Sequence, residues 1–500
     1  MITLATCVLT LLAAETDRPF AIEVVDEATG RGVPLVELTT TSGVTFITDS
    51  AGLVAFDEPG LMNQLVYFAV KSHGYEVKKD GFGFPGVRLE IKSGGFGTIK
   101  IKRLNIAERL YRVTGQGIYR DSVQLGRQPP IKEPLLNAKV AGQDSVQNAI
   151  YQGKLRWFWG DTTWPAYPLG NFHMPGAVSR LPADGGLDPA VGVDLTYFTG
   201  ENGFARGTAE MPGNGPTWIG GVAVLPDKEG RERLLCGYAK IKAPMEVYRR
   251  GIAQWNDETE RFDRVSDFEP TVPPYPDGHP LRYRDGNTDY IYFASPYPLV
   301  RVRANAESYL DLSAYEAYTC LKPGAKTSDG EIDRDDAGLV RYAWKRNTPP
   351  VGPGEQAKLV NSGKLKAEET LLQLRDAATG KAVTTSSGSV NWNAYRKRYV
   401  MITSELFGSS MVGEIWYAEA DSPIGPWSKA VKIVTHDKYS FYNPKQHPYF
   451  DQDGGRVIYF EGTYTHTFSG NEHRTPRYDY NQIMYRLDLA DERLKPAQQP

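Results

Sequence analysis

The stretch "LRWFWGDTT" (155–163) is an apolar run that ends in a glycine, an acid and two threonines. A buried strand packs well without an acid at its end, so Asp161 is either a turn residue or a side chain that the strand delivers to a site. Four similar runs follow along the chain: "LLCGYAKI" (234–241), "YIYFASPY" (290–297), "YVMITSEL" (399–406) and "VIYFEGTY" (457–464). Self-similarity at this long spacing indicates a repeat architecture.

Each of the five runs stands in the same local order. An approach strand and a short hairpin precede the run, in the segments 144–154, 217–233, 279–289, 389–398 and 446–456. A third strand follows each run, in the segments 176–181, 251–256, 299–304, 414–421 and 482–489, and a more polar fourth strand follows most of them. Five four-stranded units in this order predict an all-β chain with a five-bladed β-propeller over residues 127–495.

Two segments stand apart from the repeat. Residues 104–126 predict a linker, and we expect the stretch 115–123 to supply the missing outer strand of the last blade. The interval 321–386 is too long for a connection between blades, so we expect an insertion that forms a lid or a binding wall. Within it, "SGKLKAEETLLQLRDAATG" (362–380) has helix-like spacing, and "NTPPVGPGEQ" (347–356) predicts a loop.

The first hundred residues differ from the rest. The start, "MITLATCVLTLLAA" (1–14), is too short to span a bilayer and predicts a secretory signal, although no basic residue precedes it; a first strand is the alternative. Residues 15–103 alternate short apolar and polar runs between turns, which is typical of strands. We therefore expect an exported protein, secreted or periplasmic, that begins with a small β domain.

The overall composition excludes several functional classes. The 57 Lys and Arg nearly balance the 60 Asp and Glu, so neither a nucleic-acid-binding surface nor an acidic tail is expected. No later segment is apolar enough to span a membrane. The three cysteines lack zinc-ligand spacing, and we expect Cys236 and Cys320 to be free buried thiols, with a single bridge between them as the alternative. We expect a monomer.

Polar and aromatic residues occupy the positions that a propeller turns toward its axis, where the first strand of each blade lines the channel. A channel filled for packing alone would contain Val, Ala and Ile. Here the strand entrances carry Asp144, Trp218, His279, Asn391 beside Trp392 and Asn393, and His447. The ends of the second strands bring Asp161, Lys240, Ser295, Glu405 and Glu461. This set predicts a polar ligand site on the axis.

Glycosidic hydrolysis suits these side chains, because it needs one carboxylic acid, one carboxylate and groups that hold a sugar ring. Asp144 is our candidate for the base or nucleophile, with strand capping as its alternative role. The candidates for the acid are Asp161, Glu246, Glu405 and Glu461, of which Glu246 could instead pair with Arg249 or Arg250. The candidates for sugar contacts are Trp159, Trp164, Trp218, His279, Asn391, Trp392, His447 and Tyr464.

Two parts of the chain resemble known families. "VVDEATGRGVPLVEL" (24–38) and "TDSAGLVAF" (48–56) resemble the carboxypeptidase-regulatory-like domain, a transthyretin/Ig-like β-sandwich. "AGQDSVQNAIYQGKLRWFWGDT" (141–162) and "GEIWYAEADSPIGPWSKAVKI" (413–433) resemble five-bladed propeller glycoside hydrolases of the arabinanase-like and DUF4185-type branches. The resemblance implies hydrolysis of a furanose-rich polysaccharide, an essential acid at Asp144, and a histidine near the axis beside a bound cation, for which His447 and calcium are the candidates.

The chain also departs from the arabinanase pattern, which places further acids at the later blade entrances where this sequence has Trp218, His279 and Asn391. The identity of the acid therefore does not transfer from the family. Three other functions remain open: a non-catalytic sugar-binding propeller, a scaffold for surface interactions, and a lyase that would use Lys240, His279 and Arg282 on an acidic sugar. Stereochemistry, linkage and mode of attack are not fixed by the sequence.

Overall fold

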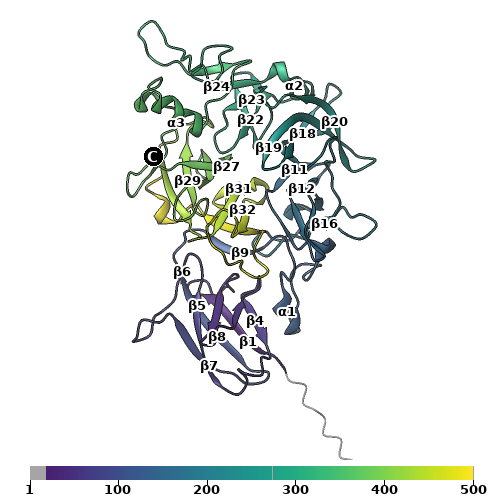
Figure 1. Cartoon of the computed structure of the whole chain (residues 1–500), viewed down its shortest axis with the longest axis vertical. Coiled ribbons are helices and arrows are strands. Elements are labelled where there is room, and N and C mark those ends of the chain that lie inside the picture. Colours follow the sequence, from purple (N-terminus) through teal and green to yellow (C-terminus); the bar gives the residue numbers. More distant parts are fainter. Residues whose placement is uncertain (1–17, 273, 499–500) are drawn as a thin grey trace, which may run out of the picture.

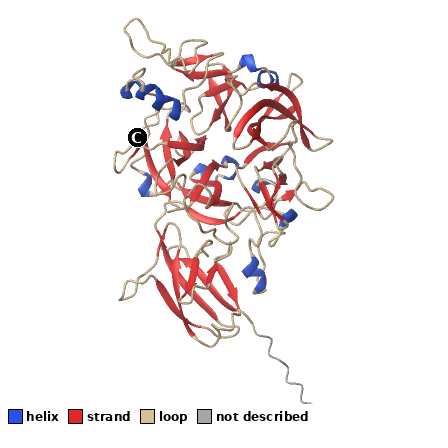
Figure 2. Cartoon of the chain, viewed as in Figure 1, coloured by secondary structure: helices blue, strands red, loops and turns tan. Residues whose placement is uncertain are grey.

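The computed structural model describes residues 18–272 and 274–498, so the predicted signal at 1–14 lies outside the described residues. Strands connected by loops make up most of the described chain, with only a few short helices (Figure 2). The prediction of an all-β protein is confirmed. Among the described residues, no helix is both long enough and apolar enough to cross a membrane.

Residues 20–103 form two four-stranded sheets. The first contains β4 (Leu53–Phe56), β1 (Phe20–Asp26), β8 (Phe96–Arg103) and β6 (Tyr75–Glu76); the second contains β3 (Thr45–Ile47), β2 (Glu37–Thr40), β5 (Leu65–Lys71) and β7 (Gly86–Glu90). Buried side chains of both sheets, such as Ile22 on β1 and Phe68 on β5, belong to one hydrophobic cluster. Burial alternates along β5, so this strand has one core face and one outer face.

Six further sheets follow. One is three-stranded and contains β10 (Gly142–Gln143), β13 (Thr162–Trp164) and β14 (Tyr167–Asn171); the other five we number one to five in chain order. Sheet one contains β11 (Gln147–Tyr151), β12 (Lys154–Phe158), β15 (Gly176–Ser179) and β16 (Thr196–Tyr197). Sheet two contains β17 (Thr217–Pro226), β18 (Glu232–Lys242), β19 (Glu246–Asn256) and β20 (Arg261–Phe268). Sheet three contains β21 (His279–Asp285), β22 (Thr288–Ala294), β23 (Val300–Arg303), β24 (Glu316–Thr319) and β25 (Ala343–Lys345).

Sheets four and five complete the series. Sheet four contains β27 (Thr385–Asn393), β28 (Arg398–Glu405), β29 (Ile415–Ala420), β30 (Lys429–Val434) and the short β26 (Arg375–Asp376). Sheet five contains β31 (Ser440–Gln446), β32 (Val457–Thr465), β33 (Asn481–Asp488) and β9 (Glu108–Arg112). Each of the five apolar runs contributes the second strand of its sheet, namely β12, β18, β22, β28 and β32.

The first strands of the five sheets lie next to one another in succession. β11 contacts β17, β17 contacts β21, β21 contacts β27, and β27 contacts β31. A hydrogen-bond contact between Asn148 on β11 and His447, next to β31, joins the last sheet to the first. The sheets therefore surround a common axis in a propeller-like arrangement, with the N-terminal sheets to one side (Figure 1).

The outer strand of sheet five comes from the N-terminal side of the chain, but not from the expected stretch. β9 pairs with β33, with Tyr111 opposite Met484. The stretch 115–123 instead holds Gly115 and Gly117, both with positive φ, and the start of helix α1 (Arg120–Gln124). Because two left-handed residues interrupt an extended chain, the strand lies upstream, where all five residues of β9 are buried.

The insertion between sheets three and four contains a helix in a different place from the one predicted. Helix α3 (Pro353–Asn361) begins in the Pro-Gly segment, with Pro353 at a position where its missing N–H costs nothing. The stretch 362–380 forms only a 3₁₀ turn at Ala367–Glu369 and the short β26. A small core of its own supports the insertion: Cys320, Leu321, Val351, Leu359 and Leu365.

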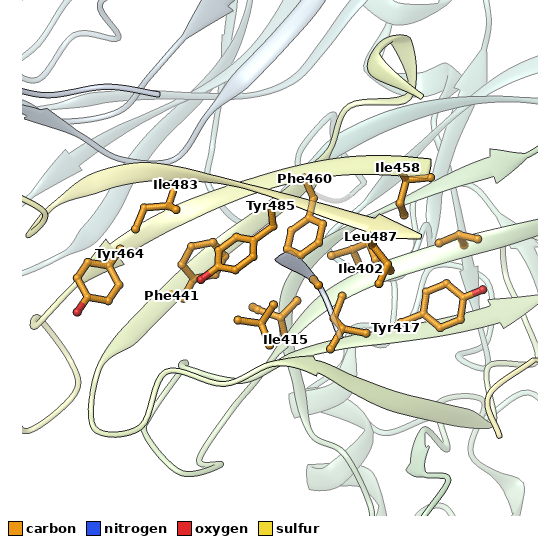
Figure 3. Close-up of a cluster of buried hydrophobic side chains, with 14 of the residues drawn as sticks. Ile402, Ile415, Tyr417, Phe441, Ile458, Phe460, Tyr464, Ile483, Tyr485 and Leu487 are labelled. Carbon is orange, nitrogen blue, oxygen red and sulfur yellow. The ribbon is translucent and has the colours of Figure 1, made fainter. Parts of the chain in front are cut away.

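Sheets four and five share a large buried cluster, shown in Figure 3. Ile402 and Tyr417 enter it from sheet four, and Phe460 and Tyr485 enter it from sheet five. Leu35 of the N-terminal sheets belongs to the same cluster. The N-terminal sheets and the last sheet of the ring therefore share one core.

Candidate active site

Two acids of sheet one lie together at one end of the axis. Asp144 lies just before β11, and Asp161 follows the end of β12, as the sequence predicts. The N–H of Gly160 donates to the backbone oxygen of Asp144 at 2.8 Å. A Cβ at position 160 would lie only 2.2 Å from Oδ1 of Asp144. The carboxyl group of Asp144 can therefore occupy its position beside residues 160 and 161 only because residue 160 is a glycine. Asp161 is thus more than a turn residue.

Asp144 is surrounded by hydrogen-bond donors. The hydroxyl of Tyr442 donates to its Oδ2 at 2.7 Å, and the Tyr480 hydroxyl and the N–H of Asp161 also bond to the carboxyl group. Burial and the neighbouring charge of Asp161 nevertheless raise the pKa of Asp144 to about 7. Because its side chain is only half-buried, this carboxyl group is both perturbed and reachable. Such groups are typical of functional sites.

Asp161 has one strong partner, Trp218 at the start of β17. The indole Nε1 donates to Oδ1 of Asp161 at 3.3 Å. Burial raises the pKa of Asp161, and the Trp218 hydrogen bond partly opposes that rise. The charge of Asp161 also raises the pKa of Asp144, so the pair binds a proton more readily than two isolated carboxyl groups would. The pKa of Asp144, about 7, lies near neutral pH, where this group can both donate and accept a proton.

A polar rim adjoins the two acids. The side chain of Asn443 donates to Oγ of Ser145 at 2.7 Å, and its backbone N–H donates to Oγ of Ser387 at 3.1 Å. The N–H of Ser145 donates to Oγ1 of Thr463 at 3.0 Å. Ser145 and Asn443 both have positive φ, an uncommon backbone conformation for these residue types. These hydroxyl and amide groups suit a ligand that is rich in hydroxyls.

A second polar cluster is buried on the axis. Glu461 on β32 lies opposite Lys445 on β31, and its Oε1 is 3.5 Å from Nε2 of His447. Burial raises the pKa of Glu461 to about 8 and lowers that of Lys445 to about 7. Burial also lowers the pKa values of His447 and His279 well below the usual range. With Glu461 and His447 fully buried, this cluster contributes the electrostatics of the axis rather than a surface for a polymer.

This cluster does not fit the calcium ion expected at the axis. Calcium prefers six to eight oxygen ligands. Here the Lys445 ammonium is the cation that neighbours Glu461, and it donates to the backbone oxygen of Asn148 at 3.2 Å. Among the described residues, no group of three or more His, Cys, Asp or Glu side chains is arranged to hold a metal ion.

The other candidate acids lie elsewhere. Glu405, at the end of β28, accepts a hydrogen bond from Trp416 Nε1 at 2.8 Å, and the charges that act on it belong to Glu414, Lys432 and Asp376 of its own sheet. Glu246 pairs with Lys242 at 3.0 Å and not with the arginines expected. Neither acid is a partner of Asp144 or Asp161.

The aromatic candidates for sugar contacts differ in whether they reach the acid pair. Trp159 and Tyr464 are fully buried, and Trp159 stacks on Trp157 with ring centroids 5.9 Å apart, so neither ring presents a face to a ligand. Trp164 packs on Phe204. Of the predicted sugar contacts, Trp218 is the one that reaches an acid of the pair. Lys240 is buried and donates to Thr217 at 3.1 Å.

Asn391 and Trp392 are at the wrong end of their strand for this site. β27 begins at Thr385, so these two residues lie near its hairpin, where Trp392 is half exposed against Tyr399. The polar start of β27, "TSSG", reads as a loop, which is why the strand was expected to begin later. Asn393, also at this end, donates to the backbone oxygen of Gly455 at 2.7 Å. The corresponding entrance residue is Ser387.

Sequence reasoning missed the rim residues Ser145, Ser387 and Asn443, and also Tyr442, Tyr480 and Lys445. β31 begins at Ser440, whereas the approach strand was expected at 446–456, a stretch that forms two 3₁₀ turns. Tyr442 and Lys445 therefore lie on an entrance strand that went unrecognised. Tyr480 lies in a loop with positive φ, where no periodic pattern exists. Aligning "SFYNPKQ" (440–446) with the other first strands would have identified it as the first strand of sheet five.

Comparisons with known proteins give a structural likeness only. No family model and no curated protein matches the chain. An exo-β-1,3-galactanase from Phanerochaete chrysosporium, solved with galactose, is 10% identical with a TM-score of 0.35; the match covers 70% of this chain and 61% of the galactanase. A Penicillium chrysogenum α-L-arabinanase in complex with arabinobiose is 13% identical with a TM-score of 0.33, covering 77% and 99%.

A third solved structure, an exo-1,5-α-L-arabinanase from a bovine ruminal metagenomic library, is 11% identical with a TM-score of 0.35, covering 70% of this chain and 94% of that one. Likenesses at these TM-scores carry no argument about activity. The function proposed below therefore rests on the side chains around Asp144.

Proposed function

We propose that this protein is an exported glycoside hydrolase in which Asp144 and Asp161 form the catalytic carboxyl pair. Its sheets one to five would be the blades of a five-bladed propeller, and the N-terminal sheets a β-sandwich. The observation that carries the proposal is the Asp144 carboxyl group, which is reachable, has a pKa raised to about 7, and lies beside a second acid. A glycosidic bond is cleaved by such a pair, one member protonating the leaving oxygen and the other activating water or attacking the sugar.

The surrounding side chains have roles in this reaction. Tyr442 and Tyr480 donate to Asp144 and limit the rise of its pKa, so that the carboxyl group can release its proton near neutral pH. Trp218 orients Asp161 and presents a half-buried indole beside it. The rim of Ser145, Ser387 and Asn443 would hold sugar hydroxyls. A polysaccharide that is furanose-rich, such as arabinan, is the substrate class we propose.

The test is release of reducing sugar from arabinan, fructan, xylan, β-1,3-galactan and polygalacturonate by the full chain and by Asp144→Asn. We expect one neutral glycan to be cleaved, with a loss of at least about a hundredfold in the variant, which corresponds to a few kcal/mol of transition-state stabilisation. Activity that survives in Asp144→Asn would remove Asp144 from the mechanism.

A non-catalytic sugar-binding propeller is the second candidate. It is favoured by the sugar-like rim, which needs no acid chemistry to hold a ligand. In that case glycans would bind equally well to the wild-type protein and to Asp144→Asn, and neither protein would cleave them. Binding in the absence of cleavage would therefore select this alternative.

A further inference from the structure

A cleft of about 750 Å³ lies between sheets two and three and the insertion. One wall is formed by residues 270–272 and 274–277, between β20 and β21, and the other by residues 324–328 and 347–355 of the insertion. Its floor contains Ser295 and Tyr297, directly after β22. The volume lies in the range of ligand-binding pockets. None of the residues discussed above as catalytic lines it.

The cleft opens at the same end of the sheets as the acid pair. Ser295 follows the last residue of β22, as Asp161 follows the end of β12. Tyr297, on the cleft floor, lies three residues after the end of β22. Second strands end, and first strands begin, at the end of the ring where Asp144 lies. The cleft and the acids are therefore on one face of the molecule.

A continuous path of residues joins the two. Trp218, which bonds to Asp161, and Arg250 both pair with Ala239 across sheet two. Two strand spacings, ~10 Å, thus separate their backbones. The Arg250 guanidinium lies 4.0 Å from the centre of the Tyr275 ring and 3.9 Å from Asp277 Oδ2, and Tyr275 and Asp277 line the cleft. A polysaccharide that extends from Asp161 past Trp218 would therefore enter the cleft beside Tyr275 and Asp277.

The lining matches a neutral sugar chain. Its apolar surface comes from Val272, Tyr275 and the prolines 270, 274, 349, 350 and 353, which suit the C–H faces of sugar rings. Hydroxyl and amide groups of Thr271, Ser328 and Asn347 are available to sugar hydroxyls. Three charged residues line the cleft: Asp277, which faces Arg250, together with Lys326 and Glu355. Because Arg250 balances Asp277, and Lys326 balances Glu355, the cleft has no feature that selects a charged polymer.

We propose that this cleft is a subsite for a neutral polysaccharide, holding the part of the chain that extends beyond the acid pair. This inference deepens the proposed function and rests on it for the direction of the chain. The insertion then acts as a binding wall. A polymer gains contacts in the cleft that a single sugar does not, so the cleft favours chains over short glycosides.

Two variants test the subsite. Ser328→Trp fills the cleft from an exposed position, and Thr259→Trp, on an exposed hairpin of sheet two away from the cleft, is its control. Tyr275→Ala removes an apolar surface of the cleft, and Tyr275→Phe, which keeps the aromatic ring, is its control. In an Asp144→Asn background, we measure retardation of the full chain in gels that contain linear arabinan, β-1,3-galactan, xylan or polygalacturonate. We expect one neutral polymer to retard the protein, with about tenfold weaker binding for Ser328→Trp and Tyr275→Ala only.

With Asp144 intact, the same variants are compared on the polymer and on the p-nitrophenyl glycoside of its sugar. We expect kcat/KM to fall about tenfold on the polymer and to be unchanged on the glycoside. An equal effect on both substrates would overturn the subsite and leave the hydrolase intact. Retardation by polygalacturonate alone, or by no polymer, would also overturn it. Retardation that depends on Ser328 without cleavage by the wild-type chain would support the cleft and reject the proposed hydrolase.

Discussion

At the scale of single residues, the site depends on a glycine. Gly160 leaves the space that Oδ1 of Asp144 occupies, and any side chain there would displace this carboxyl group. Burial, and then the charge of Asp161, raises the pKa of Asp144, while Tyr442 and Tyr480 limit that rise. The balance places the pKa of Asp144 at about 7.

This balance predicts a pH profile. Asp144 has a pKa of about 7, so kcat/KM should fall as the pH rises through that value, because the proton that the leaving group needs is lost. Tyr442→Phe removes a donor that stabilises the carboxylate, which raises this pKa and moves the alkaline limb to higher pH. Initial rates from pH 4 to 10 for both proteins measure the shift. A limb that stays in place, or moves to lower pH, would contradict the assignment.

At the scale of elements, the strands that share the repeated apolar pattern could be predicted from the sequence, and the strands that lack it could not. The apolar second strands could be found because each buries both faces and repeats in a fixed order. The first strands of sheets four and five begin with "TSSG" and "SFYN", which do not continue the apolar pattern of the second strands. Their polar residues Ser387 and Asn443 bond to each other between the two sheets, a contact that no local pattern reveals. Hence Asp144 and Asp161 were predicted, and Tyr442, Lys445 and Ser387 were not.

The insertion offers a test at this scale. Lys345 Nζ is buried 2.7 Å from Asp333 Oδ2, and Arg341 lies 2.8 Å from Oδ1. These two cations lower the pKa of Asp333, so its stabilising effect is present above the usual carboxyl pKa and is lost in more acidic solution. Asp333→Asn should destabilise the insertion by about 2 kcal/mol, seen as faster amide exchange within 321–345.

The matched control for this experiment is Glu331→Gln. Glu331 pairs with Lys322 at 3.6 Å with both side chains exposed, so its loss should leave amide exchange unchanged. Equal exchange in the two variants would show that the buried pair does not hold the wall of the cleft.

At the scale of the whole molecule, the N-terminal sheets and sheet five form one structural unit. Arg109 on β9 is buried and donates to the backbone oxygens of Pro34 at 3.0 Å, His73 at 3.2 Å and Leu35 at 3.3 Å. Leu35 also enters the cluster shared by sheets four and five. The strand that completes the last sheet of the ring is therefore held by the N-terminal sheets.

Removal of this arginine should destabilise the whole chain rather than one part. Arg109→Ala removes a donor from three carbonyl groups, of which, among the described residues, only that of Leu35 keeps another partner, Ser72. We expect the free energy of unfolding to fall by about 3 kcal/mol, with a single transition for both regions in urea. Arg127→Ala removes an exposed pair with Glu23 at 3.4 Å and should cost about 0.5 kcal/mol. Two separate transitions in the wild-type protein would contradict a shared core.

The central claim is that Asp144 and Asp161 carry the chemistry. Its most direct measurement is the rate of reducing-sugar release on the best neutral glycan for Asp144→Asn, Asp161→Asn and Glu405→Gln side by side. We predict that the first two each lose at least about a hundredfold and that Glu405→Gln, whose partners all lie in sheet four, stays within about twofold of the wild type. A large loss in Glu405→Gln with full activity in Asp161→Asn would contradict the account.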